Sequence, residues 1–348
     1  MLKVSEYEVK NVKDNLNRYP FLIKSLGEKW LEREIFVQKR RMEMHNLFWI
    51  LLDKNKCVRL EKWFTDIYES LSQQVLKKIV KKLKEKRGSI QIYSFLPEIE
   101  VLAYYALVKL KYPYIKDITY EPKISHGRSD VKILFENNDE VYMEVSTLFE
   151  SEKEQRYEEI ISEIWEKIES IDNNPYLISF HIDITFEKED IESFILFIEN
   201  KIKSYRGKLP SENLKFGEKG YIKFISRVNN GHVLSMSSPL IIISNTEERI
   251  KRKIRDEAKQ LPQNKLGVIN LCLFNPLIRC DEVKNAFLGT EVYNVHNKTT
   301  CRKTNGVDKK CKNVNVLIIF RNFEYECRQK IKNSKAFKTI PKYIYEIL

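Results

Sequence analysis

Apolar residues recur at helical spacing through the first 92 residues of the chain. The clearest set, at intervals of three and four positions or adjacent, is Leu76, Ile79, Val80 and Leu83. Lysines fill most of the positions between them, which is typical of an amphipathic helix that buries one face. Gly88-Ser89 interrupts the pattern shortly before it changes. The spacing therefore predicts a helical N-terminal region over residues 1–92.

A different pattern begins at about residue 93. Ser94 is a suitable N-cap, and Pro97 fits the first turn of a helix that the apolar spacing extends to about residue 112. Three short extended segments follow at 118–124, 129–136 and 140–148, separated by turn-forming residues. A long amphipathic helix over 151–171 and an apolar strand over 176–185 come next. The predicted order is helix, three strands, helix, strand.

The pattern after residue 185 alternates between helices and strands. Helices are expected at 189–205, 246–261 and 281–288, a hairpin at 221–237, and strands at 266–274 and 314–321. The alternation predicts the α/β class with a mixed central sheet. Two domains are expected: the helical region, 1–92, and an α/β part, 93–348. In the second, the core spans about 96–185 and the rest forms a C-terminal α/β extension.

The composition narrows the class of protein. Hydrophobic residues make up 43% of the chain and charged residues 32%, as in a globular protein and unlike a disordered one. The longest apolar run, Val101 to Val108, is far below the roughly 18 residues that a membrane helix needs. Residues 1–10 contain no apolar signal core, and the six cysteines form no CxxC pair. These features favour a cytoplasmic protein that does not enter a membrane.

Charge is distributed unevenly along the chain. The net charge is +9 over residues 1–94, −14 over 95–200 and +17 over 201–348, which leaves +12 for the whole chain. An acidic centre thus lies between two basic flanks. One interpretation is a Glu-rich surface helix, which is common. The other is a carboxylate-rich metal centre whose basic flanks hold phosphates.

Two acids interrupt strands that are otherwise apolar. Asp130 stands at the start of the second extended segment, and Glu144 lies inside the third. A carboxylate in a sheet core is costly unless it is paired or bound to a cation, and a tight loop between the strands would bring these two together. Glu98 or Glu100 on the preceding helix could supply a third acid. Alternatively, Asp130 could accept hydrogen bonds from turn amides and Glu144 could pair with a basic residue.

The order of these elements and acids resembles the PD-(D/E)xK nuclease superfamily, which has the restriction-endonuclease-like fold. The similarity covers about residues 96–185. It implies that Asp130 and Glu144 match the two acids of the motif, and that Glu100 or Glu98 matches the glutamate on the helix. In that superfamily these acids bind Mg²⁺ or Mn²⁺ and direct water at a phosphodiester. The resemblance therefore implies a metal site formed by these residues, with Mg²⁺ or Mn²⁺ as the cofactor.

One position departs from the pattern of that superfamily. A lysine is expected two residues after the second acid, and Ser146 stands there. The lysine orients the water and stabilises developing charge, so another cation must replace it in an active enzyme. Lys132 is the expected catalytic replacement because alternation places it on the same strand face as the first acid. Lys153 is a second candidate, whereas Lys253 and Lys259 are more simply interpreted as a solvated helix face.

Two basic stretches could contact a nucleic-acid backbone. The first lies on a predicted helix, and the residues expected to bind nucleic acid there are Lys77, Lys81 and Lys84. The second lies in a predicted loop and contains Arg302, Lys303, Lys309 and Lys310. A solvated surface explains the first stretch equally well, whereas a basic loop favours phosphate contact slightly. Neither stretch has interleaved aromatic residues, so sequence readout is not expected.

Taken together, these features predict a divalent-metal-dependent nuclease that hydrolyses phosphodiester bonds with little sequence readout by the protein. Nucleic acid is the expected partner, with DNA favoured over RNA, and a homodimer is left open. The alternative is a catalytically inactive protein of the same fold that binds nucleic acid or takes part in an assembly, with Ser146 marking the lost chemistry.

Overall fold

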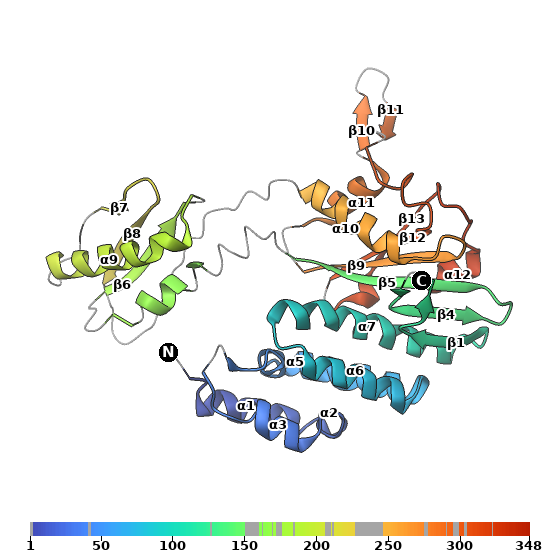
Figure 1. Cartoon of the computed structure of the whole chain (residues 1–348), viewed down its shortest axis with the longest axis horizontal. Helices are drawn as coiled ribbons and strands as arrows, with labels where there is room; N and C mark the ends of the chain where they lie inside the picture. Colours follow the sequence, from blue (N-terminus) through green and yellow to red (C-terminus); the bar gives the residue numbers. More distant parts are fainter. Residues whose placement is uncertain are drawn as a thin grey trace. The chain divides into compact units, whose positions relative to one another are not determined.

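The computed structural model arranges the chain as two compact units (Figure 1). Unit 1 consists of Met1–Phe149 and Asn245–Leu348, and unit 2 of Glu150–Ser244, so unit 2 is an insertion in the sequence of unit 1. The structure describes residues 3–40, 43–125, 127–149, 160–161, 163–168, 170–171, 176–183, 185–205, 210, 212–226, 246–274, 278–289, 291–294, 299–302, 305–321 and 323–348.

Unit 1 begins with a series of helices, some of which are capped by a side chain at the N-terminus. The helices are α1 (Glu6–Leu16), α2 (Pro20–Leu26), α3 (Glu28–Glu34), α4 (Leu47–Leu51), α5 (Lys54–Ser70) and α6 (Gln73–Glu85). Ser5 and Glu8 form a capping box at α1, and the Ser72 hydroxyl accepts the amide hydrogen of Val75 at α6. These caps satisfy amide groups that have no partner inside the helix. The predicted helical region is confirmed.

A mixed six-stranded sheet forms the centre of unit 1. Its strands, in spatial order, are β1 (Ile115–Tyr120), β4 (Val131–Phe135), β5 (Glu140–Leu148), β9 (Leu266–Leu273), β12 (Val316–Arg321) and β13 (Gln329–Lys332). The pairs β1–β4, β4–β5 and β12–β13 are antiparallel, whereas β5–β9 and β9–β12 are parallel. The prediction of an α/β protein with a mixed central sheet is confirmed at this level.

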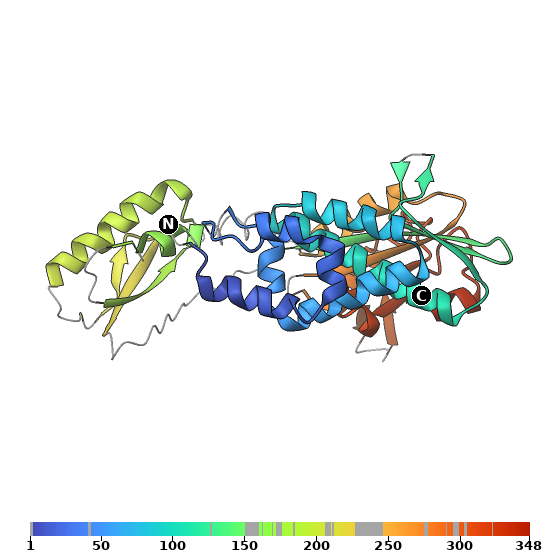
Figure 2. The same cartoon turned by 90° about the horizontal axis from the view of Figure 1, so that it is seen from below.

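Helices cover both faces of this sheet. Helix α7 (Ser89–Lys111) lies between the sheet and helices α5 and α6, and α10 (Thr246–Gln260) and α11 (Cys280–Leu288) lie on the other side (Figures 1 and 2). One hydrophobic core joins the N-terminal helices, α7 and one face of the sheet. A second core joins α10, α11 and the opposite face. The helical region and the sheet therefore share a core, and the domain boundary expected near residue 92 does not divide them.

Unit 2 has a sheet and a hydrophobic core of its own. Its described elements are β6 (Tyr176–Ile182), the 3-10 helix η2 (Lys188–Asp190), α9 (Ile191–Tyr205), β7 (Leu214–Phe216) and β8 (Gly220–Ser226). The sheet is antiparallel in the order β6-β8-β7. The prediction that the strand over 176–185 completes the core sheet is therefore wrong. Strand β9 is the parallel neighbour of β5 instead. The prediction failed because an apolar strand pattern does not specify which sheet the strand joins.

Several element boundaries differ from the sequence pattern for local reasons. Helix α7 begins at Ser89, so Pro97 lies inside the helix and not in its first turn. The segment 118–124 divides into β1 and β2 (Lys123–Ile124), because Glu121 adopts a left-handed conformation with φ 50°. Strand β2 pairs with β3 (Gly127–Arg128). Most of the helix predicted over 151–171, and residues 227–237 of the predicted hairpin, lie outside the described residues.

The C-terminal part of unit 1 contains elements that the pattern did not predict. They are the hairpin β10 (Glu291–Asn294) and β11 (Thr299–Arg302), the 3-10 helix η3 (Tyr325–Cys327), strand β13 and helix α12 (Lys342–Ile347). None of the helices that the structure describes combines the length and the apolar composition needed to cross a bilayer.

Candidate functional site

Asp130 and Glu144 lie next to each other on one face of the central sheet. Val131 pairs with Met143 across β4 and β5, and the Asp130 amide donates to the Met143 carbonyl at 3.1 Å. The Asp130 carboxylate accepts the amide hydrogen of Val145 at 2.7 Å, and it also interacts with the carboxyl group of Glu144. Asp130 therefore continues the pairing of β5 with a side chain at the point where β4 begins.

Glu98, and not Glu100, lies beside this pair. The charge of Asp130 acts on Glu98, which is half-buried on α7. Glu100 lies two positions further along the helix and therefore points to another side. Its buried carboxylate accepts the amide hydrogens of Phe323 and Tyr325, both at 2.9 Å. The expectation that Glu100 takes part in the site is corrected: Glu100 anchors the turn that precedes and begins η3.

That turn also supports the main chain of Glu144. The Tyr325 hydroxyl donates to the Asn270 side-chain oxygen at 2.6 Å, and the Asn270 side-chain nitrogen lies 3.4 Å from the Glu144 carbonyl. Tyr105 contributes a hydroxyl 3.1 Å from that of Tyr325. All four side chains, including that of Glu144, are buried. A hydrogen-bonded brace thus connects η3, through β9, to the backbone beneath the acidic pair.

A fourth acid, Glu257 on α10, reaches the same face of the sheet. It follows unit 2 in the sequence. Its Oε1 accepts the Ser146 hydroxyl hydrogen at 2.8 Å and lies 3.1 Å from the Lys253 ammonium. Its Oε2 accepts a hydrogen bond from Gln260 at 2.8 Å. Its charge raises the pKa of both Asp130 and Glu144. Glu257 was not expected from the sequence, although Lys253 stands four residues before it on a predicted helix, which is the spacing of an i,i+4 ion pair.

Burial and mutual repulsion shift the proton affinities of these acids. Burial raises the pKa of Glu144, and the neighbouring charge of Asp130 adds to the shift. Burial likewise raises the pKa of Asp130 to about 6 and that of Glu98 to about 8, with Asp130 contributing to the second shift. Glu144 Oε1 is buried with no hydrogen-bond partner among the described residues. The cluster therefore concentrates negative charge that its hydrogen bonds do not fully compensate.

Lys253 and Lys82 face the cluster, whereas Lys132 does not. Lys253 contacts Glu257, and Lys82 on α6 interacts electrostatically with Glu98 and Asp130. Lys132 instead lies 3.5 Å from Glu140, at the other end of β4. Alternation along the strand places Lys132 on the same face as Asp130, but its long side chain extends to the oppositely charged Glu140 on β5. The expectation that Lys132 is the cation of the site is thus corrected, and Lys153 lies outside the described residues.

The other predicted phosphate contacts are scattered. Lys77 and Lys81 are exposed, and Lys81 lies 4.0 Å from Glu85. Lys84 lies over the Trp30 ring on another side of α6. Lys309 and Lys310 are exposed in a turn near the end of α11, the Arg302 backbone lies in β11, and Lys303 is outside the described residues. The cations from this part of the chain that act on the acids are Lys82, on α6, and Lys86, which follows the helix and acts on Glu98.

The donor atoms of the cluster suit a hard divalent cation. Carboxylate oxygens are the ligands that Mg²⁺ and Mn²⁺ prefer, and a cation at Glu144 Oε1 would satisfy that buried atom and relieve the repulsion. In the conformations that the structure describes, no three His, Cys, Asp or Glu side chains are placed to hold one ion. The contacting pair Asp130 and Glu144 thus fits the ion in chemistry, and further ligation requires a change of rotamer.

The raised pKa values predict a pH dependence of the stability of the metal-free protein. The folded chain binds more protons than the unfolded chain, so the free energy of unfolding must fall as pH rises. This contribution is complete below about pH 4 and is lost as pH rises through about 6 for Asp130 and about 8 for Glu98. Thermal unfolding in EDTA across this range should show a shallower dependence for Glu144→Gln than for the wild type. An unchanged slope would contradict the repulsion inferred here.

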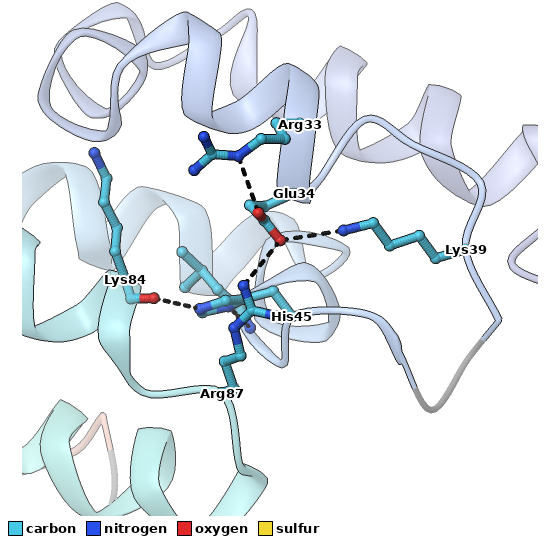
Figure 3. A network of polar contacts seen from close by, with 7 residues as sticks. Arg33, Glu34, Lys39, His45, Lys84 and Arg87 are labelled. Carbon is cyan, nitrogen blue, oxygen red and sulfur yellow. Dashed lines mark hydrogen bonds and ion pairs between the residues drawn. The ribbon is translucent and has the colours of Figure 1, made fainter.

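A second buried polar cluster, among the N-terminal helices, is fully paired. The Glu34 carboxylate lies within 3.6 Å of the cationic groups of Arg33, Lys39 and Arg87 (Figure 3). His45 places Nε2 3.2 Å from the Lys84 carbonyl, and its Nδ1 accepts the Leu47 amide hydrogen. An open surface hollow of about 710 Å³ lies near Trp30, and Glu28 is the one acidic residue among those that line it. This cluster therefore has the character of a structural network that joins α3 to the end of α6.

Comparison with known proteins adds no relationship: neither a protein-family model, nor a curated protein, nor a solved structure matches this chain.

Proposed function

We propose that the chain is a divalent-metal-dependent nuclease that hydrolyses phosphodiester bonds. The observation that carries this proposal is the cluster of Glu98, Asp130, Glu144 and Glu257, which come from α7, the start of β4, β5 and α10. Stability alone does not explain it, because buried acids that repel each other destabilise a fold. Such arrangements are typical of functional sites, where a ligand supplies the missing charge.

The element order supports the proposed restriction-endonuclease-like core. Helix α7 is followed by β1, β4 and β5, and then, after unit 2, by α10 and β9. This is again helix, three strands, helix, strand, with α10 and β9 in the places that the sequence pattern had given to 151–171 and 176–185. The carboxylates lie on the helix, the second long strand and the third, as in the superfamily that the sequence resembles.

The side chains divide the chemistry between them. Asp130 and Glu144 would hold the cation, and its chemistry is to lower the pKa of a bound water and to neutralise the phosphate. Lys253, fixed by Glu257, would donate to the attacking water or to the oxygen that gains charge. Ser146 orients Glu257 through its hydroxyl, so the serine that replaces the motif lysine still helps to place a lysine. Lys82 would stabilise the phosphate on the α7 side.

Cleavage assays test this proposal directly. We expect the purified protein to cleave circular DNA, linear DNA or RNA in Mg²⁺ or Mn²⁺, with DNA the better substrate, and EDTA to stop the reaction. Complete lack of cleavage of all three substrates in both metals would overturn the assignment. Retention of salt-sensitive binding in that case would favour the inactive nucleic-acid-binding protein, a second candidate supported by Ser146 at the lysine position.

A further inference from the structure

Three cations converge on one carboxylate beside the acidic cluster. Glu121 forms ion pairs with Lys78 and Lys82 of α6, and the Arg128 guanidinium of β3 lies 3.9 Å away. The Glu121 side chain is only 10% exposed, whereas those of Lys78 and Arg128 are 43% and 60% exposed. The group therefore carries a net charge of about +2 at neutral pH, with its anion inside and two of its cations open to solvent.

The backbone of this group is unusual. Glu121 has φ 50°, a left-handed conformation that is unfavourable for a residue with a side chain. Its amide donates to the Asp130 carbonyl at 2.8 Å, and Pro122 accepts the Ser129 amide hydrogen at 3.2 Å. The conformation thus fixes Glu121 directly opposite the first acid of the candidate site. Strained residues of this kind are concentrated at ligand sites and switches.

The cations are also connected to the acidic cluster. Lys82 contacts Glu121 and interacts electrostatically with Glu98 and Asp130. The Tyr120 ring lies under both lysines, with ring-to-ammonium distances of 5.1 Å for Lys78 and 5.4 Å for Lys82. These contacts limit the directions in which the ammonium groups can move, so they remain near the site when their anion changes.

We infer that Lys78, Lys82 and Arg128 form a subsite for a backbone phosphate of nucleic acid, and that the Glu121 carboxylate occupies it in the free protein. The inference rests on the proposed function for the identity of the ligand. A phosphodiester carries one negative charge and accepts hydrogen bonds from Lys and Arg as a carboxylate does, so it can exchange with Glu121. Binding of the polymer then releases an internal anion as well as counterions.

This exchange explains why a cationic subsite stays closed in the absence of polymer. A single small anion must displace a carboxylate that is already in place, whereas a polyanion has contacts elsewhere that favour the exchange. Glu121 is thus a competitor within the chain, and its removal should strengthen binding of nucleic acid and not weaken it.

Binding of a short fluorescein-labelled DNA duplex, followed by fluorescence anisotropy in EDTA, tests the inference without any hydrolysis. We expect Glu121→Gln to bind about five- to tenfold more tightly than the wild type, with a salt dependence steeper by about one unit of slope. The matched control is Glu140→Gln, which also removes one negative charge and frees two lysines, Lys132 and Lys265, at the other end of β4. Its effect should stay within about twofold.

Further variants keep the result interpretable. In the Glu121→Gln background, Arg128→Ala should return the affinity to about the wild-type value; in the wild type it should have a smaller effect, because the cation is already occupied. Equal affinities for Glu121→Gln and Glu140→Gln would overturn the inference, and so would weaker binding by a folded Glu121→Gln protein. Stabilisation of the variant by inorganic phosphate without tighter DNA binding would also overturn it. Tighter binding without cleavage by any variant would refute the nuclease and leave the subsite intact.

Discussion

Replacing Glu144 with glutamine should lower the rate of metal-dependent cleavage about 10³-fold or more, because it removes one of the two negative charges that would hold the cation. Glutamine has nearly the same shape, and its neutral amide is compatible with a buried position. The measurement is the initial rate of cleavage of a labelled substrate at saturating Mn²⁺. A rate within threefold of the wild type would contradict the assigned role of this residue.

The same substitution should stabilise the metal-free protein by about 1 kcal/mol, because it removes repulsion from Asp130 and Glu257. Chemical unfolding in EDTA measures this gain. Glu140→Gln on the same strand is the control. The Glu140 carboxylate pairs with Lys132 and Lys265, so this variant should lose up to about 1 kcal/mol of the free energy of unfolding and cleave at the wild-type rate. Opposite changes in stability at two glutamates of one strand would separate a ligand site from an ordinary ion pair.

Replacing Lys253 with methionine should lower the cleavage rate about 10²-fold, because the variant loses a cation held at the acidic cluster. Methionine keeps the length and the apolar stem of the side chain, so helix α10 should remain folded. Loss of the lysine frees Glu257 from an ion pair at 3.1 Å. If Lys253 acts in catalysis, kcat should fall while the affinity for uncleaved DNA changes little.

Lys259 provides the control on the same helix. It lies 2.7 Å from Asp256 and is 76% exposed, so Lys259→Met should leave both kcat and DNA affinity unchanged.

Lys82→Met should weaken DNA binding more than it lowers kcat, since Lys82 belongs to the phosphate subsite. Normal turnover by a folded Lys253→Met protein would exclude this residue as the replacement for the motif lysine.

The sequence predicted one half of the candidate site because that half is local. Strands β4 and β5 are joined by a tight loop, and this loop fixes the register that brings Asp130 beside Glu144. Strand β5 was predicted with its exact bounds because turn residues precede it and most of its residues are apolar or β-branched. Their meeting is thus a property of one hairpin.

The other half depends on contacts between distant segments. Ser146 and Glu257 are 111 positions apart, with unit 2 between them, and no local pattern specifies that distance in space. The choice between Glu98 and Glu100 was equally open, because both lie on a helix with apolar residues on most sides. Only the packing of η3 against α7, which supplies two amide donors to Glu100, decides it.

The insertion explains the misassigned strand. Residues 176–182 form a buried strand, as the apolar run indicates, but they pair within unit 2. A parallel neighbour for β5 must come from a crossover connection, and the chain places all of unit 2 inside that connection. Sequence periodicity describes each strand and gives no information on how long the crossover is.

The buried hydrogen bonds of Tyr325 and Asn270 beneath Glu144 determine when the repulsion between the acids begins to cost stability. Because these buried side chains hold the main chain of β5 in place, the acids cannot relax by a retreat of the backbone. The penalty is therefore imposed during folding, before an ion arrives. An incoming ion would need only side-chain rotations, so its capture should be fast and insensitive to the slow motions of the polypeptide.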